Sequence, residues 1–329
     1  MPRYYLSGGR QRVSRFVRRE EWSSFEAAVL LELDTDTAQV RSIFEYQGAA
    51  DRVPATDPSH IFKTASWDDH HLLLCTQTEV LVFDPKECKV ERTISHPCFN
   101  DVHHAARIGG KIHVVSTGLD AVFALDENDA ISGEFGATGA DPWARFDRHT
   151  DYRRVATTKP HAAHPNFVFE SAGTGWVTRF EQRDAVRLDG RGSPLKVADA
   201  PIHDGLPVGE HAWFTAVRGE VIQAHPAHGK RIATYDLNTF PRASAEPLGW
   251  CRGIHVERAR TLVGFSRLRP TLFKQNLSWL RAAANRPEPL PTRVTAYDLA
   301  AGRELQSWPL EASGMSAVFG ILPVDRGGI

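Results

Sequence analysis

An apolar residue followed by an acidic residue and then by turn-forming residues recurs along the chain at the end of a strand-like run. Successive copies are 42 to 62 residues apart, and the six copies are Leu33-Asp34, Phe83-Asp84, Leu125-Asp126, Phe180-Glu181, Tyr235-Asp236 and Tyr297-Asp298. A second strand-like run follows the copies, as in residues 38–44 and 89–94. We therefore expect six hairpins in which the acidic side chain can accept hydrogen bonds from the amides of the turn.

Another strand-like run precedes the hairpins, and it recurs at 72–76, 112–116, 167–171, 212–216 and 262–266. Residues 4–9 fit the same place in a first unit. Six four-stranded units with irregular spacing and little helix predict an all-β fold, a six-bladed β-propeller. A β-sandwich would explain the short strands but not the six-fold recurrence.

The first unit begins at its second strand and therefore lacks an innermost strand. Residues 316–322, near the C-terminal end, can supply that strand. Such a 3+1 closure pairs the two chain ends in one sheet and leaves no open seam of unpaired backbone groups. We expect a single propeller domain over 1–329, because a division into two domains would leave the last strand without a partner.

Three segments interrupt the repeat, at about 10–22, 137–160 and 269–292. The first and third connect the second and third strands of a unit, and the other connects two units. In four-stranded blades these two kinds of connection lie on the same face. We therefore expect the three insertions to gather over one mouth of the central channel, as lids do.

Composition narrows the functional classes. The 329 residues are 42% hydrophobic and carry a formal net charge of -1, which excludes nucleic-acid binding through overall charge. The four cysteines show no CxxC spacing and no apolar leader is present, so we expect a cytoplasmic protein with reduced thiols. No apolar run reaches the length of a transmembrane helix, so no membrane partner is expected. No phosphate-binding glycine loop occurs, so no nucleotide cofactor is expected.

Histidines gather where the innermost strands start, at the rim of the predicted channel. Five of the six starts contain one, at 59–62, 100–104, 159–164, 201–204 and 250–255. Alignment on the second strands places His103 opposite His203, with Arg252 near the same level. His161 reaches that level only through a shorter loop, so its register relative to His164 stays open.

This ring of imidazoles predicts one divalent transition metal on the propeller axis. The candidate ligands are His103, His161, His164 and His203. Asp101 or Asp204 would give carboxylate support, and strand parity puts Asp101 on the side of His103. Neutral imidazole suits Fe, Cu or Zn better than Ca or Mg, and we favour Fe or Cu. The alternative is a water-lined channel in which these side chains bond to one another, since no local ligand motif such as HExxH is present.

Arginines point to an anionic ligand on the same face. Arg252 lies at the channel level, and Arg218, Arg267 and Arg269 follow second strands, so these four are the candidate substrate-binding residues. Guanidinium pairs well with a carboxylate or phosphate. The alternative for the insertion arginines is pairing with nearby acids such as Asp151. Asp101, Arg252 and His255 are the candidate catalytic residues.

Several of these segments together resemble a bacterial β-propeller family of unknown function. The similar segments are 100–102 with 115–118, 160–165 with 170–175, and 250–253 with 263–269, within residues 95 to 270. More distantly, the six-blade plan is similar to the gluconolactonase and strictosidine synthase-like group, whose members place a metal or a catalytic carboxylate on the axis. That resemblance implies an axial site. The lactonases of that group use acidic and amide ligands suited to Ca, whereas this rim is rich in histidine.

The sequence thus favours a metal-dependent enzyme, an oxidoreductase acting on a small anionic metabolite or natural-product intermediate. Two other classes remain: a non-catalytic propeller that binds a peptide or partner protein, and a lactonase or lyase-type propeller enzyme. Neither the substrate nor the oligomeric state follows from the sequence.

Overall fold

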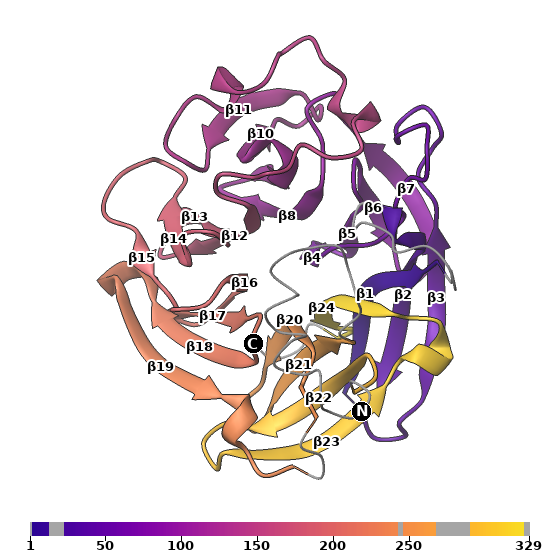
Figure 1. Ribbon diagram of the computed structural model, residues 1–329, viewed down its shortest axis with the longest axis vertical. Coiled ribbons are helices and arrows are strands. Elements are labelled where there is room, and N and C mark those ends of the chain that lie inside the picture. The colour runs from indigo at the N-terminus through magenta and orange to yellow at the C-terminus, as the bar shows by residue number, and fades with distance from the viewer. Residues whose placement is uncertain (1, 13–22, 243–245, 268–289, 326–329) are drawn as a thin grey trace.

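The computed structural model describes residues 2–12, 23–242, 246–267 and 290–325, and these form six four-stranded antiparallel sheets around a central axis (Figure 1). This confirms the predicted six-bladed β-propeller. Blade 1 consists of β24 (Ala317–Pro323), β1 (Arg3–Gln11), β2 (Phe25–Asp34) and β3 (Val40–Tyr46). Blade 2 consists of β4 (Ala65–Asp68), β5 (His71–Cys75), β6 (Val80–Asp84) and β7 (Lys89–Ile94). Blade 3 consists of β8 (Val102–Ile108), β9 (Lys111–Ser116), β10 (Ala121–Leu125) and β11 (Ile131–Gly136).

The other three blades follow in chain order around the ring (Figure 1). Blade 4 consists of β12 (Pro165–Ser171), β13 (Thr174–Arg179), β14 (Asp184–Arg187) and β15 (Leu195–Lys196). Blade 5 consists of β16 (Ile202–Val208), β17 (His211–Ala216), β18 (Glu220–His225) and β19 (Lys230–Asp236). Blade 6 consists of β20 (Trp250–Val256), β21 (Thr261–Ser266), β22 (Arg293–Asp298) and β23 (Arg303–Pro309). No helix in these described segments is long and apolar enough to span a membrane.

The C-terminal strand closes the ring. β24 pairs antiparallel with β1, with Ser7 opposite Gly320 and Leu6 opposite Ile321, and so becomes the innermost strand of blade 1. This is the 3+1 closure that the sequence predicts. A strand from one chain end thus removes the unpaired edge that the other end would leave.

The core lies between the blades. The middle strands are buried on both faces because a neighbouring blade covers each one, and adjacent residues such as Val114 and Val115 are both fully buried. The outermost strands are largely exposed, as in β7. This gradient explains why the inner strands read as continuous apolar runs while the outer strands are polar.

The acidic residues that end the third strands bind the following turn in four blades. One carboxylate oxygen of Asp34, Asp84, Asp126 and Asp298 accepts one or two amide N–H groups of that turn. The prediction is wrong in the other two blades: Glu181 follows the second strand of blade 4, and Asp236 ends the fourth strand of blade 5. The predicted hairpin is therefore confirmed in four blades, because the spacing of strands within blades 4 and 5 differs from that of the others.

A ring of hydrogen bonds near the axis joins every blade to the next, a feature that the sequence analysis did not anticipate. Each bond links a polar side chain to the backbone of a neighbouring inner strand. The six bonds are Ser7 Oγ to Lys63 O, Thr64 Oγ1 to His103 O, Thr117 Oγ1 to Pro165 O, Asn166 Nδ2 to Ile202 O, Gly253 N to Asp204 Oδ2, and Ser266 Oγ to Val318 O. These bonds fix the inner strands relative to one another and thereby shape the channel.

Of the three predicted insertions, the one between blades 3 and 4 lies within the described residues. It contains two short 3-10 turns, η3 (Pro142–Ala144) and η4 (Tyr152–Arg154). Tyr152 is tied to the start of the inner strand, since Asn100 Nδ2 donates to its carbonyl at 2.8 Å. Residues 13–22 and 268–289, which make up most of the other two insertions, lie outside the described residues.

Candidate functional site at the channel mouth

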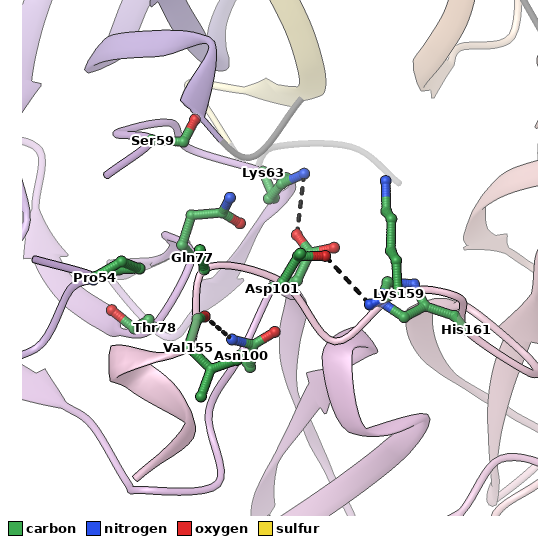
Figure 2. Close-up of a pocket in the computed structure, with 12 residues that line it drawn as sticks. Pro54, Ser59, Lys63, Gln77, Thr78, Asn100, Asp101, Val155, Lys159 and His161 are labelled. Carbon is green, nitrogen blue, oxygen red and sulfur yellow. Dashed lines mark hydrogen bonds and ion pairs between the residues drawn. The ribbon is translucent and has the colours of Figure 1, made fainter. Parts of the chain in front are cut away.

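A pocket lies where the inner strands of blades 2 and 3 begin, beside the insertion between blades 3 and 4 (Figure 2). Its lining comes from segments 54–63, 77–78, 100–101 and 155–161, and it includes the charged or titratable residues Lys63, Asp101, Lys159 and His161. Figure 2 shows Lys63 joined to Asp101 by its ion pair, with the side chain of Lys159 to one side of this pair. The lining residues thus include two lysines and one aspartate, a composition that favours an anionic ligand.

Lys63 and Asp101 form an ion pair in the lining of this pocket. Lys63 Nζ lies 3.2 Å from Asp101 Oδ1, and their side chains are only 3% and 19% exposed. Burial alone would raise the pKa of Asp101, but the charge of Lys63, with smaller contributions from His103 and other histidines, holds it well below its usual range. Asp101 is therefore a carboxylate at neutral pH. Its φ of 51° turns the chain into the inner strand, a conformation that Asp tolerates better than most residues.

The tautomer of His103 follows from its neighbours. Its Nδ1 lies 2.9 Å from the Asp101 backbone carbonyl oxygen and 2.8 Å from Thr117 Oγ1. Thr117 gives its own hydroxyl proton to the carbonyl of Pro165. Both neighbours of Nδ1 are therefore acceptors, so Nδ1 carries the proton and Nε2 presents a lone pair. Burial lowers the pKa of His103 to about 4, although Asp101 opposes the shift, and the ring is neutral at pH 7.

His161 and His164 lie on the loop that leads into β12, and Asp120 holds this loop. Asp120 Oδ1 accepts the backbone N–H of Ala163 at 2.9 Å and of His164 at 2.8 Å, and its Oδ2 accepts that of Ala162 at 2.7 Å. The carboxylate is buried. Asp120 therefore positions the loop that carries both histidines, although it is not one of the residues that line the pocket.

The histidine rings form a continuous row. The Nδ1 atoms of His161 and His164 are 3.2 Å apart, and the His164 ring meets the His103 ring edge-on at 5.1 Å between centroids. Phe180 then separates His164 from His203, with centroid distances of 4.8 Å and 5.3 Å. The structure thus brings His103, His161 and His164 into contact and places His203 one ring further away.

Asn166 fixes the protonation of His203. Thr178 donates to Asn166 Oδ1, which directs the Asn166 amide N–H groups to the Ile202 carbonyl at 2.8 Å and to His203 Nδ1 at 3.2 Å. His203 Nδ1 is thus an acceptor and Nε2 carries the proton. Among the described residues nothing accepts that buried proton. Burial, and next the charge of Arg252, lower the pKa of His203 well below its usual value.

Strand register shows that blade 4 has a different residue at the position that His103 and His203 occupy in the neighbouring blades. Val102, Pro165 and Ile202 each pair with the last residue of the second strand of their blade. The residues that follow them are His103, Asn166 and His203. Asn166 therefore takes the place in blade 4 that histidine takes in blades 3 and 5, while His161 and His164 come from the preceding loop.

The four predicted ligands do not converge on one point. In the described part of the chain, three or more potential ligand atoms lie within 4.8 Å of one another only in a cluster on blade 2. In the channel, His161 and His164 turn their Nδ1 atoms toward each other, and His203 Nδ1 already accepts a bond from Asn166. An axial metal would require His161 and His164 to turn toward His103, whose Nε2 lone pair is the best-placed ligand atom.

The predicted substrate-binding arginines are dispersed. Arg252 lies near the axis, with its guanidinium 4.7 Å from the Phe319 ring centroid, and its charge acts on His203. Arg267 pairs with Glu311 through two bonds of 2.7 Å, and Arg218 is exposed beyond β17. Arg269 lies outside the described residues. Among the three of these arginines that the structure describes, only Arg252 is placed beside the histidines.

The described arginines of the insertion between blades 3 and 4 mostly pair with acids. Arg145 binds Asp120 at 2.9 Å, Arg148 binds Glu134 at 3.0 Å, and Arg153 binds Asp151 at 2.8 Å. These ion pairs correspond to the alternative that the sequence left open, in which such arginines support the loop. They give the loop its shape and leave the lysines as the cations of the pocket lining.

His255 and Asp204 lie apart from the pocket. His255 is near the far end of β20, where its ring packs 5.3 Å from that of Tyr4 in blade 1 and its Nε2 lies 3.7 Å from Glu257. Asp204 is fully buried and accepts bonds from the Thr215 hydroxyl and the Gly253 N–H. Burial raises its pKa to about 7. Asp204 therefore belongs to the contact between blades 5 and 6.

Sequence reasoning missed Lys63, Lys159 and Asp120. Lys159 opens the start at 159–164 and was within a segment singled out for histidine, whereas Lys63 directly follows the start at 59–62 and was just outside it. A search of those starts and the residue after each for every ionisable side chain would have found the two lysines. Asp120 lies in the turn between β9 and β10, and no local pattern indicates that it binds a loop 42 to 44 residues further along the chain.

Comparison with known proteins agrees with the architecture. No family model matches the chain, and no curated protein matches it significantly. Among solved structures, a chain of the nidogen–laminin complex is similar with a TM-score of 0.59 and 10% identity, over 98% of each chain. A streptogramin B lyase is similar with a TM-score of 0.50 and 11% identity, over 97% of this chain and 91% of that one.

At such low identity these likenesses concern the fold alone. They support the distant similarity to β-propellers, whereas the narrower resemblance to a bacterial family of unknown function stays a prediction. The chain is a six-bladed β-propeller whose channel mouth holds a lysine–aspartate pair beside a row of buried histidines.

Proposed function

We propose that the protein is an enzyme that acts on a small anionic molecule bound at the channel mouth. The observation that supports this most is the buried Lys63–Asp101 pair in a pocket that Lys159 and His161 also line. A charged pair held out of water is costly unless it serves the structure or a ligand. Here it lines a pocket and lies beside other ionisable groups, which is the setting of many catalytic sites.

The residues of the site suit acid–base chemistry on an anion. The ammonium groups of Lys63 and Lys159 would hold a carboxylate or phosphate and stabilise negative charge that develops on the substrate. The Nε2 lone pair of His103 would accept a proton, because Nδ1 is already held by two acceptors. This arrangement favours the lyase-type alternative, and a lyase is among the proteins that share the fold.

Anion binding is tested by the stability of the folded protein in the presence of inorganic phosphate, succinate or citrate. A ligand at 100 times its Kd should raise the free energy of unfolding by about 2.7 kcal/mol. We expect Lys159→Met to lose most of this gain while leaving the Lys63–Asp101 pair intact. Lys196→Met, at a side chain that is 83% exposed, is the matched control. Equal gains in wild type and Lys159→Met would contradict the proposed site.

Catalysis is tested separately by incubating the protein with a pool of small anionic metabolites and following their masses. We expect a compound to be consumed by wild type and not by His103→Ala or Asp101→Asn. If anions bind but nothing is consumed, the protein is the non-catalytic propeller that the sequence also allowed.

A metal-dependent oxidoreductase is the second candidate. The observation in its favour is that His103 donates Nδ1–H to a backbone carbonyl, the arrangement that orients most metal-binding histidines. His103, His161 and His164 would hold Fe, Cu or Zn, and such a metal would supply redox or Lewis-acid chemistry. Metal analysis of untagged protein tests this. Near-stoichiometric metal in wild type that falls in the double variant His103→Ala and His164→Ala supports it, and equal content contradicts it.

A further inference from the structure

Blade 2 contains a second group of potential ligands, away from the channel mouth. His71, Asp84 and Glu91 come from β5, β6 and β7, and one ligand atom of each lies within 4.8 Å of those of the others. These three strands run side by side in the outer part of the blade (Figure 1). We propose that this cluster binds a divalent transition metal ion of the zinc class, independently of the function proposed for the channel.

Strand register explains why the three side chains meet. Leu72 pairs with Phe83, and so His71, at the start of β5, lies opposite Asp84, at the end of β6. On the other side of β6, Phe83 pairs with Val90 and Val82 with Arg92, which leaves Glu91 as the extra residue of a β-bulge. A bulge redirects the side chain of its extra residue, and here Glu91 reaches across β6 to His71.

The contact between His71 and Glu91 is short but is not an ordinary hydrogen bond. His71 Nε2 lies 2.8 Å from Glu91 Oε2. Nevertheless, His71 Nε2 is inaccessible to solvent and has no partner with hydrogen-bond geometry among the described residues. An unsatisfied buried nitrogen is costly, and a bound cation would satisfy it.

Asp84 is held in place to present its second oxygen. Its Oδ1 accepts the backbone N–H groups of Lys86 at 2.8 Å and Glu87 at 3.2 Å. These bonds fix the carboxylate and leave Oδ2 for a cation. In most other blades the equivalent acid makes the same turn bonds, but only blade 2 combines it with a histidine and a bulge glutamate, in the part of the chain that the structure describes.

The ligand chemistry selects the ion. One imidazole nitrogen and two carboxylate oxygens suit Zn²⁺ or a similar transition metal, whereas Ca²⁺ and Mg²⁺ prefer oxygen ligands alone. Two carboxylates also balance the charge of a dication. Three protein ligands would leave a tetrahedral ion one position for water.

The test is a calorimetric titration of Zn²⁺ into full-length protein freed of metal. We expect one site that His71→Ala and Glu91→Gln each weaken by about tenfold or more, which is about 1.4 kcal/mol. His70→Ala is the matched control, because His70 is the exposed neighbour that pairs with Asp69 at 2.9 Å. Glu91→Gln preserves the size of an exposed side chain and so guards against misfolding.

The outcomes separate this site from the channel. Binding that is lost in His71→Ala but kept in the double variant His103→Ala and His164→Ala supports the blade 2 site. If Zn²⁺ binding is lost in this double variant but kept in His71→Ala, the blade 2 site is overturned and the channel histidines bind the metal instead. Absence of Zn²⁺ binding in wild type also overturns it and leaves His71 and Glu91 as a simple ion pair.

Discussion

Two buried aspartates near the axis have opposite pKa shifts. Asp101 lies 3.2 Å from Lys63, whose charge keeps it ionised despite burial. Asp204 receives a hydroxyl proton and one amide N–H but no ammonium group, and burial raises its pKa to about 7. The difference follows from the partner of each carboxylate, since burial acts to raise both pKa values.

Asp204 should make stability fall as the pH rises from about 4 to about 7. The folded state retains a proton that the unfolded chain releases near pH 4, so the stabilisation is complete below pH 4 and is lost as the pH passes the folded pKa of about 7. Asp204→Asn keeps an oxygen for Thr215 and Gly253 and cannot titrate. We expect urea unfolding between pH 5 and pH 8 to show a difference between wild type and variant that changes by up to about 1.4 kcal/mol per pH unit.

The comparison with the variant is necessary because buried histidines act in the opposite direction. The pKa values of His103 and His104 are lowered to about 4 and about 3, mainly by burial. These rings stay neutral in the folded state while the unfolded chain takes up protons below about pH 6.5. Their contribution to stability therefore falls as the pH falls. A wild type and Asp204→Asn that respond identically to pH would contradict the raised pKa of Asp204.

At the scale of secondary-structure elements, a turn of blade 3 fixes the position of the loop that leads into blade 4. The turn between β9 and β10 supplies Asp120, which binds the amides of residues 162–164 and so places His161 and His164 beside His103. The loop into β12 has no regular structure of its own to fix it. The site therefore depends on a carboxylate that would not contact the ligand.

Asp120→Asn should disturb both the loop and the pocket. The amide NH₂ would face N–H donors where a carboxylate oxygen now accepts them, at a cost of about 1–3 kcal/mol. We expect weaker anion binding in the stability assay and a lower free energy of unfolding. Asp126→Asn is the control, since Asp126 also accepts two turn amides in blade 3 but lies in a hairpin away from the loop. Unchanged anion binding in folded Asp120→Asn would show that the loop position does not matter to the site.

Irregularities of the inner strands also belong to this scale. Backbone φ values of 51°, 50°, 64° and 77° occur at Asp101, His164, Asp204 and Gly253, close to a register shift in each strand. A bulge changes which face a side chain takes. The period of two in the sequence could therefore not decide between His161 and His164 or reveal Asn166 in their place.

For the whole molecule, closure depends on close approach of the two chain ends. Gly8 of β1 packs so tightly against β24 that an added Cβ would lie 2.0 Å from the Ala317 carbonyl oxygen. The neighbouring strand Ala317–Pro323 also contacts blade 6, through the bond from Ser266 to Val318. Loosening this pairing would open the ring at blade 1 and expose the edge of β1.

Gly8→Ala should therefore destabilise the entire propeller. The backbone of β24 would have to shift, at a cost of the order of 3 kcal/mol, comparable to severe overpacking. We expect a large fall in the thermal unfolding temperature and a tendency to aggregate. Gly133→Ala in β11 is the control, because its added Cβ would meet only an ordinary contact at 3.4 Å. Equal stability of the two variants would contradict the view that closure limits the stability of the ring.

The amino-acid sequence by itself determined the number of blades, the closing strand and the hairpin turns of four blades. These features depend on local patterns, such as an apolar–acidic pair before a turn or an alternating strand, whereas in blades 4 and 5 the same pair follows a different strand. The sequence also placed His103 and Asp101 together at an inner-strand start, because residues two positions apart on a strand share a side.

Only the tertiary structure decided how the channel mouth is built. Lys63 meets Asp101 across a blade boundary, Asp120 binds a loop of the next blade, and Asn166 sets the tautomer of His203 across another boundary. These contacts join residues 37 to 44 positions apart, and their partners are selected by bulges and by the packing of blades. Which residues become partners depends on the packing of all six blades, so no local pattern in the sequence predicts these contacts.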